Sequence, residues 1–113
     1  ILGLTFKENC PDIRNTKVID IFNHLVKSEC QVMISDDYAN EDEILNEFGI
    51  NSTNLEDIKN CNCVIVAVGH KRYTSLKLDD WKKIMNSDST LIDVKSLFKK
   101  NTFKGTSINY WRL

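Results

Sequence analysis

Residues 63–68, with the sequence CVIVAV, are the most apolar run in the chain. Its apolar residues follow one another without the alternation of a half-exposed strand, which indicates a strand covered on both faces. Such strands are typical of parallel sheets, whose connections pass over the faces as helices. This run therefore predicts an α/β fold built on a parallel sheet.

Short apolar runs alternate with helical patterns along the rest of the chain, and this order predicts successive β-α-β units. Further strands are expected at 1–4, 31–35, 50–53, 90–94 and 106–110, and helices at 17–27, 41–48, 55–60 and 78–86. Right-handed crossovers place such helices on both faces of the sheet. We expect a Rossmann-like three-layer α/β/α sandwich with a mostly parallel sheet of about five or six strands.

Length and charge limit the classes of function. The 113 residues suit one domain, and a hydrophobic fraction of 42% is enough for a core. The 15 basic and 16 acidic side chains give a net charge of −1, which argues against a general nucleic-acid surface. No run has the length of a membrane span, and the first residues lack the features of a signal peptide.

The four cysteines, Cys10, Cys30, Cys61 and Cys63, are interpreted as reduced structural thiols of a cytoplasmic protein. The two histidines are not spaced as metal ligands beside them, so we predict no metal site. Only Cys10 lies in a loop where a cation, Lys7, could lower the pKa of a thiol. Because no Ser-His-Asp order and no Walker A loop occurs, we assign no catalytic residue to this chain.

Charged side chains gather where the predicted strands end. The first strand turns directly into a loop that holds Lys7, Pro11 and Arg14, and a second polar loop with Lys95 follows the strand at 90–94. The other loop cations, which follow the run at 63–68, are Lys71 and Arg72. Open α/β sheets bind their ligands at the carboxyl ends of the strands. Ammonium and guanidinium groups are strong donors to phosphate. These loops therefore predict binding of a small phosphorylated ligand.

The pair Asp36-Asp37 follows the predicted strand at 31–35 and has three interpretations. An acid at this place can bind a ribose hydroxyl in Rossmann units, but no G-x-G-x-x-G precedes it. It can also form a turn or cap a helix, which is the interpretation that we favour. With Lys95 it suggests a phosphoacceptor receiver domain, although the acidic pair of receivers follows the first strand and not the second.

The run GLTFKENCPDIRN, from Gly3 to Asn15, closely resembles the start of the C-terminal domain of the UDP-glucose/GDP-mannose dehydrogenase family. Residues 36–38, 61–68, 69–73 and 93–95 are also similar to segments of that family, so the resemblance spans the whole chain. It looks best with the bacterial branch that oxidises UDP-N-acetylhexosamines for surface polysaccharides.

The resemblance implies that residues 1–113 are the UDP-sugar-binding C-terminal domain of an NAD-dependent UDP-sugar 6-dehydrogenase. Such an enzyme oxidises the C6 alcohol of a UDP-hexose or a UDP-N-acetylhexosamine to a uronic acid. It implies that Phe6, Lys7 and Lys95 contact the substrate, and that Arg14 reaches the NAD phosphates across the domain interface. The catalytic cysteine and lysine of the family lie outside this region, so the chain alone is expected to be inactive.

The resemblance also implies the partners of the domain. These are an N-terminal NAD-binding domain and a central domain of the same chain, with a homodimer at full length and neither nucleic acid nor membrane as a partner. The chain opens inside the first predicted strand without an initiator methionine, and we expect a fragment whose first strand is clipped. The alternative is a stand-alone nucleotide-binding or regulatory Rossmann-like module, which would need a native start just before Ile1.

Overall fold

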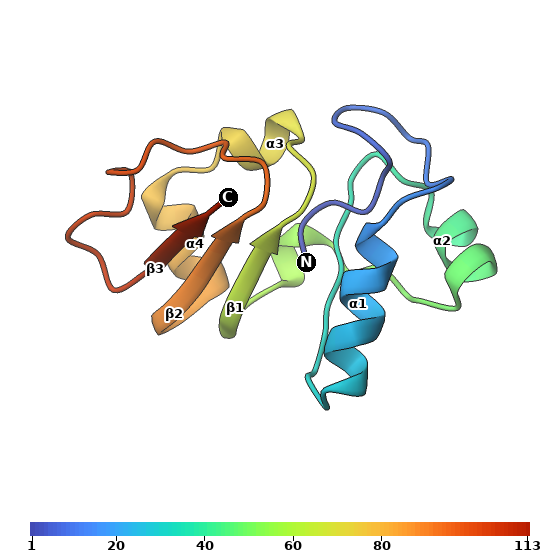
Figure 1. Ribbon diagram of the computed structural model, residues 1–113, viewed down its shortest axis with the longest axis horizontal. Coiled ribbons are helices and arrows are strands. Elements are labelled where there is room, and N and C mark those ends of the chain that lie inside the picture. The colour runs from blue at the N-terminus through green and yellow to red at the C-terminus, as the bar shows by residue number, and fades with distance from the viewer.

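The computed structural model describes residues 1–113 and contains one parallel sheet with helices around it (Figure 1). The sheet has the strand order β1-β2-β3, and both neighbouring pairs are parallel. No helix combines the length and the apolar character that crossing a membrane requires. The elements in chain order are α1 (Val18–Lys27), α2 (Glu41–Phe48), the 3₁₀ helix η1 (Leu55–Asp57), β1 (Cys61–Val66), α3 (Lys71–Thr74), α4 (Leu78–Ile84), β2 (Met85–Asp93) and β3 (Asn109–Arg112).

Two extended segments continue the sheet beyond β1 without forming regular strands. Leu2 makes isolated parallel bridges to Val66 and to Ser35. Its N–H donates to the carbonyl of Ile65 at 2.8 Å, and the N–H of Gly3 donates to the carbonyl of Ser35 at 2.8 Å. The α/β architecture with a parallel sheet is confirmed, but the sheet has three regular strands instead of the five or six that were expected.

Gly3 explains why pairing stops so early in the first segment. Its φ of +92° lies in the left-handed region, and a Cβ at this position would lie 2.5 Å from the Cβ of Val68. Only glycine accommodates this φ and this close approach without strain. Beyond it, the N–H groups of Leu4 and Thr5 donate to the side chain of Asp36 instead of to a neighbouring strand.

The apolar core forms two clusters. The larger one contains α4 and its Trp81, whose ring meets those of Phe98 and Phe103 edge to face, with centroids 5.7 and 6.1 Å away. The smaller one contains Val18 of α1 and Ile44 of α2, which pack with the first extended segments. The sheet thus carries helices on both sides, as a three-layer arrangement requires.

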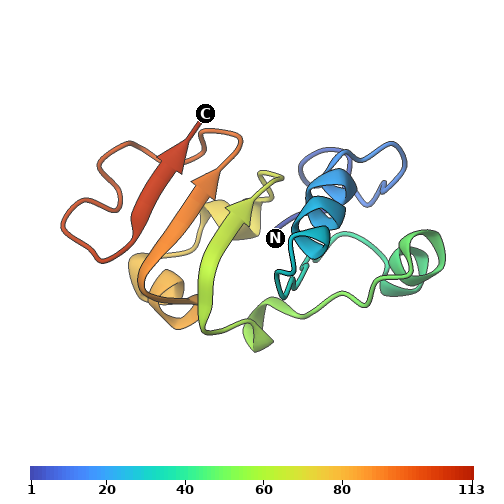
Figure 2. The ribbon, with the colours of Figure 1, turned by 60° about the horizontal axis from the view of Figure 1, so that its bottom comes forward.

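Coverage of the sheet face opposite α4 is incomplete. Figure 1 and Figure 2 show α1 beside β1, but it does not cross β2 and β3. Ile65, Ile92 and Trp111 are register partners across the three strands; Ile65 and Ile92 are half-buried, and Trp111 is 51% exposed. Cys63 in β1 is also exposed, so the expectation that residues 63–68 are covered on both faces holds only for the later part of the run.

Local sequence explains the ends of two helices. α2 begins after Asn40, whose side chain accepts the N–H of Glu43 at 3.1 Å, and it ends at Gly49 in the left-handed conformation, as predicted. α4 ends at Ile84 because Met85 is already extended and starts β2. The helical pattern had suggested two further helical residues, and β2 is correspondingly longer than the strand expected at 90–94.

Candidate functional site

The polar loops that the sequence singled out lie at the carboxyl ends of the strands. We call residues 5–14 the exit loop, because they leave the sheet after the first extended segment, and residues 94–97 the second loop, because they follow β2. Both lie at the upper edge of the molecule in Figure 1. Phe6 is 61% exposed, and Lys7, Arg14 and Lys95 are exposed as well.

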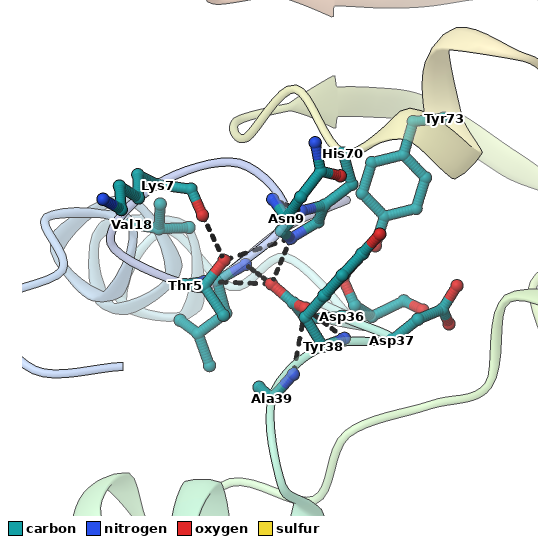
Figure 3. Close-up of polar contacts among 12 residues, drawn as sticks. Thr5, Lys7, Asn9, Val18, Asp36, Asp37, Tyr38, Ala39, His70 and Tyr73 are labelled. Atoms are coloured by element: carbon teal, nitrogen blue, oxygen red, sulfur yellow. Dashed lines mark hydrogen bonds and ion pairs between the residues drawn. The ribbon is translucent and has the colours of Figure 1, made fainter. Parts of the chain in front are cut away.

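Asp36 fixes the start of the exit loop (Figure 3). Its Oδ2 accepts the N–H groups of Leu4 at 2.6 Å and of Thr5 at 2.9 Å. Its Oδ1 accepts the N–H groups of Tyr38 at 2.9 Å and of Ala39 at 3.2 Å. The turn interpretation of Asp36 is therefore confirmed, and its side chain is too deeply buried to meet a ribose.

The hydrogen bonds to Asp36 keep it ionised. Burial by itself would raise the pKa of this carboxyl group. The hydrogen bonds from His70 and from the N–H groups of Leu4, Thr5 and Tyr38 outweigh that effect, so the pKa of Asp36 lies well below its usual value. The start of the exit loop is consequently held by a buried anion.

His70 joins the exit loop to the segment after β1. Its ring is buried, with Nε2 2.9 Å from Oδ2 of Asp36 and 3.1 Å from Oγ1 of Thr5. Its Nδ1 accepts the N–H of Asn9 at 2.9 Å. Tyr38 covers the ring by stacking, with the two ring centroids 4.6 Å apart. Both ring nitrogens are thus engaged by other residues, and this imidazole is not available as a base for Cys10.

Further contacts hold the backbone on either side of Lys7. The hydroxyl group of Thr5 donates to the carbonyl of Lys7 at 3.1 Å. The Oδ1 of Asn9 accepts the N–H of Lys71 at 2.9 Å, and Asn9 itself has a φ of +54°. Neither Lys7 nor Lys95 belongs to an ion pair within the chain. Their ammonium groups are therefore free to meet an anionic ligand.

Arg14, by contrast, is paired within the exit loop. Its Nε and Nη2 donate to the two oxygens of Asp12 at 3.0 and 2.9 Å. These hydrogen bonds lower the pKa of Asp12 to about 2. A cleft of about 450 Å³ beside the pair is lined by Glu43 and Glu47 of α2, among other residues. Arg14 thus lies on the α2 side of the loop, in acidic surroundings.

The second loop is organised by Asp93 in the way that the exit loop is organised by Asp36. The buried carboxylate of Asp93 accepts the N–H groups of Lys95 at 3.2 Å and of Phe98 at 3.0 Å, and the hydroxyl group of Tyr110 at 2.7 Å. Burial and the hydrogen bond to Asp93 raise the pKa of Tyr110 to about 12. The backbone at Lys95 is held in this way, while its side chain stays exposed.

The structure differs in two respects from the site of loop cations that the sequence suggested. Arg72, which had been counted among the loop cations, forms ion pairs with both Asp37 and Glu56, so it has a structural partner on each side. The group of Thr5, Asn9 and His70 was missed, since 65 residues separate Thr5 from His70. The one signal in the sequence was the place of His70, two residues after the end of the apolar run at 63–68.

The cysteines supply no evident reactive centre. All four are free, and no group of three or more His, Cys, Asp or Glu residues is arranged to hold a metal ion. Burial raises the pKa of the Cys61 and Cys63 thiols, which disfavours their thiolate forms. The chemistry open to this site is recognition of an anionic ligand by the two loops.

Comparison with known proteins assigns the chain to a family. The family model that matches is described as "UDP-glucose/GDP-mannose dehydrogenase family, UDP binding domain", and it covers residues 1–100. The chain belongs to this family. The resemblance that was noted at Gly3 to Asn15 is thereby confirmed.

Curated members of this dehydrogenase family are clearly related to the chain. The UDP-N-acetyl-D-glucosamine 6-dehydrogenase of Salmonella typhi is 39% identical over 95 residues, which are 84% of this chain and 22% of that protein. Protein CapL of Staphylococcus aureus is 35% identical over 113 residues, which are 100% of this chain and 26% of that protein. The chain thus spans about a quarter of the length of these relatives.

Solved structures of the family share the fold. The NDP-N-acetyl-D-galactosaminuronic acid dehydrogenase from Methanosarcina mazei Go1 matches with a TM-score of 0.85 and 27% identity, over 98% of this chain and 23% of that one. The UDP-N-acetyl-mannosamine dehydrogenase Cap5O from Staphylococcus aureus matches with a TM-score of 0.74 and 19% identity, over 98% and 24% of the two chains. The Rossmann-like fold that was expected is therefore confirmed.

Proposed function

We propose that this chain binds the UDP part of a UDP-sugar within an NAD-dependent UDP-sugar 6-dehydrogenase. The observation that carries the proposal is the state of the exit loop, in a chain that matches a UDP-binding-domain family. Hydrogen bonds hold both ends of this loop, while Phe6 and Lys7 at its tip remain exposed. The reaction would be oxidation of the C6 alcohol of a UDP-hexose or UDP-N-acetylhexosamine to a uronic acid. The product would serve surface polysaccharide synthesis.

The exposed side chains suit the chemistry of a nucleoside diphosphate sugar. The ring of Phe6, which is 61% exposed, offers a flat apolar surface to a base or a sugar. The free ammonium groups of Lys7 and Lys95 offer charge-assisted hydrogen bonds to phosphate oxygens. We propose these three residues as substrate contacts.

Lys7→Ala is expected to weaken UDP binding by roughly ten- to a hundredfold, because losing a charge-assisted contact costs about 1.5–3 kcal/mol. Titration calorimetry with UDP and the 113-residue chain measures this loss. Lys104→Ala is the matched control, since it removes an exposed lysine from the loop before β3. Equal UDP affinities for the wild type and Lys7→Ala would show that the exit loop is only scaffold.

The residues of this chain do not form an NAD site by themselves. Arg14 already uses two of its nitrogens on Asp12, and Glu43 and Glu47 beside it disfavour a pyrophosphate. We propose that NAD, the hydride acceptor of the reaction, is held by the N-terminal domain of a longer chain. Arg14 would then add a single cationic contact across the domain interface, through its unpaired Nη1.

In the full-length enzyme, Arg14→Ala is expected to raise the KM for NAD about three- to tenfold and to leave UDP affinity unchanged, since one partly paired charge is lost. Steady-state kinetics with each substrate varied in turn separate the two effects. Asp12→Ala is the control, because it frees the guanidinium group and should not raise the KM for NAD. A loss of UDP affinity in Arg14→Ala, without a change for NAD, would reverse the orientation proposed for the loop.

The dehydrogenase would be a longer protein than this chain, which spans about a quarter of the length of its relatives. We propose that residues 1–113 are its C-terminal domain, that an N-terminal NAD-binding domain and a central domain complete it, and that it forms a cytoplasmic homodimer. The chain alone would not catalyse the oxidation, because both nitrogens of His70 are engaged and this imidazole offers no base to a nucleophile.

A further inference from the structure

We propose that His70, as a neutral imidazole with its proton on Nε2, is the positioning residue that sets the backbone of Lys7 for a nucleoside diphosphate. This inference rests on the proposed function of the exit loop. The ring of His70 is 1% exposed, so it acts on the ligand only through the loop. Figure 3 shows the ring between Asp36 and the backbone of the exit loop.

The hydrogen-bond partners determine which nitrogen carries the proton. The N–H of Asn9, 2.9 Å from Nδ1, can only donate, so Nδ1 must accept. The carboxylate of Asp36, 2.9 Å from Nε2, can only accept, so Nε2 must donate. In the other tautomer, Nδ1–H would face the N–H of Asn9, and the lone pair of Nε2 would face the carboxylate of Asp36. A second ring proton would break the bond to Asn9.

The same proton position determines the direction of the contacts toward Lys7. The hydroxyl group of Thr5 has one proton, which it donates to the carbonyl of Lys7 at 3.1 Å. Its oxygen therefore accepts a hydrogen bond from Nε2–H of His70, 3.1 Å away. The same Nε2–H also donates to Asp36, so this hydrogen bond is shared between two acceptors. A continuous relay of hydrogen bonds thus runs from the ring of His70 through Thr5 to the backbone of Lys7.

The second nitrogen of the ring holds the far side of the loop. Asn9 has a φ of +54°, in the left-handed region that few residues other than glycine adopt, and hydrogen bonds hold it there. Its N–H binds Nδ1 of His70, and its side-chain oxygen binds the N–H of Lys71. Phe6 and Lys7 therefore lie in the short span between two anchors, Thr5 and Asn9, that meet at one imidazole.

Among the groups hydrogen-bonded to the ring, Asp36 is the one that carries a charge. Tyr38 stacks on it with centroids 4.6 Å apart, and Tyr73 lies at 5.4 Å and donates its hydroxyl group to the carbonyl of Ser35. Burial raises the pKa of Tyr73, so this phenol stays neutral. The negative charge of Asp36 therefore orients the Nε2–H bond.

The first test uses substitutions of His70 to separate the contact at Nδ1 from the contacts at Nε2. His70→Asn keeps an oxygen near the place of Nδ1 for Asn9 but cannot reach Asp36, whereas His70→Gln keeps a donor near the place of Nε2 but loses the acceptor for Asn9. Amide exchange at Asn9 is expected to accelerate in His70→Gln and not in His70→Asn. The Kd for UDP is expected to rise more in His70→Asn, because the relay to Lys7 starts at Nε2. An identical response of both variants would overturn the proposal.

A second variant avoids changing the imidazole. Thr5→Val removes the relay to Lys7 at a residue that is 1% exposed and does not reach the ligand. It is expected to raise the Kd for UDP about three- to tenfold, the range expected for one hydrogen bond. Thr106→Val is the matched control, since its hydroxyl group binds only within the loop before β3. A folded Thr5→Val protein with unchanged Kd would overturn the positioning role.

A third measurement needs no ligand and no variant. The ¹⁵N spectrum of the histidine side chains of the wild type is expected to show His70 protonated at Nε2 and not at Nδ1 at neutral pH. The opposite tautomer, or a doubly protonated ring, would overturn the proposal. If the wild type fails to bind UDP at all, the proposed function is wrong. Amide exchange at Lys7 and Asn9 in Thr5→Val then decides whether the relay holds the loop.

Discussion

Asp36→Ala is expected to lower the free energy of unfolding by at least about 3 kcal/mol, because each buried donor left without an acceptor costs about 1–3 kcal/mol. The carboxylate accepts Nε2–H of His70 and four backbone N–H groups, and the N–H groups of Leu4 and Thr5 would lose their acceptor in the interior. Urea unfolding at pH 7, followed by circular dichroism, measures the difference from the wild type.

Asp37→Ala is the matched control for this prediction. Asp37 is the next residue in the chain, but its carboxylate is partly exposed and pairs with Arg72 at the surface. Exposed ion pairs contribute about 0–1 kcal/mol, so the control is expected to lose no more than that. Comparable losses in the two variants would mean that Asp36 does not organise the start of the exit loop.

The contribution of Asp36 is also expected to depend on pH. Because its pKa in the folded state lies below the unfolded value of about 3.9, the carboxylate stabilises the fold fully above that pH. The stabilisation is lost as the pH falls through the folded pKa. The stability difference between the wild type and Asp36→Ala should therefore be constant near neutral pH and shrink below about pH 4.

Gly3→Ala is expected to destabilise the protein by about 2–5 kcal/mol, the sum of a left-handed alanine and an overpacked contact. The φ of Gly3 is +92°, and an added Cβ would lie 2.5 Å from the Cβ and 2.9 Å from the backbone nitrogen of Val68. Both the first segment and the segment after β1 would have to move. Urea unfolding of the variant provides the measurement.

Gly49→Ala separates the two causes of that loss. Gly49 has a φ of +68° at the end of α2, but an added Cβ would meet nothing within 4 Å. It is expected to cost only about 1–2 kcal/mol, the conformational part. Equal losses at Gly3 and Gly49 would show that the close approach to Val68 relaxes without cost.

Gly3 and Asp36 both act at the point where the exit loop leaves the sheet. Gly3 lets the backbone turn out of the ladder, and Asp36 receives the N–H groups that the turn leaves without strand partners. The loop that carries Phe6 and Lys7 thus begins at a position that is defined by backbone conformation and by a buried anion. Recognition of a ligand at the tip of the loop requires that the backbone at the start of the loop is held in one position.

Features that depend on neighbouring residues could be predicted from the sequence alone. The uninterrupted apolar run at 63–68 indicated a parallel sheet, and β1 occupies most of it. α2 has the predicted bounds because Gly49 supplies its left-handed end. The motif from Gly3 to Asn15 indicated the family, which the comparisons confirm. Periodicity, turn chemistry and motif spacing are local properties, and they do not depend on contacts with distant parts of the chain.

The tertiary structure decided the rest. It reduced the expected sheet to three regular strands, and it paired Arg14 with Asp12 beside the acidic side of α2. It also placed His70 between Asp36 and Thr5, which are 34 and 65 residues away in the chain. The role of a buried polar group is set by the donors and acceptors that folding brings within 3 Å of it, and no local pattern records those partners.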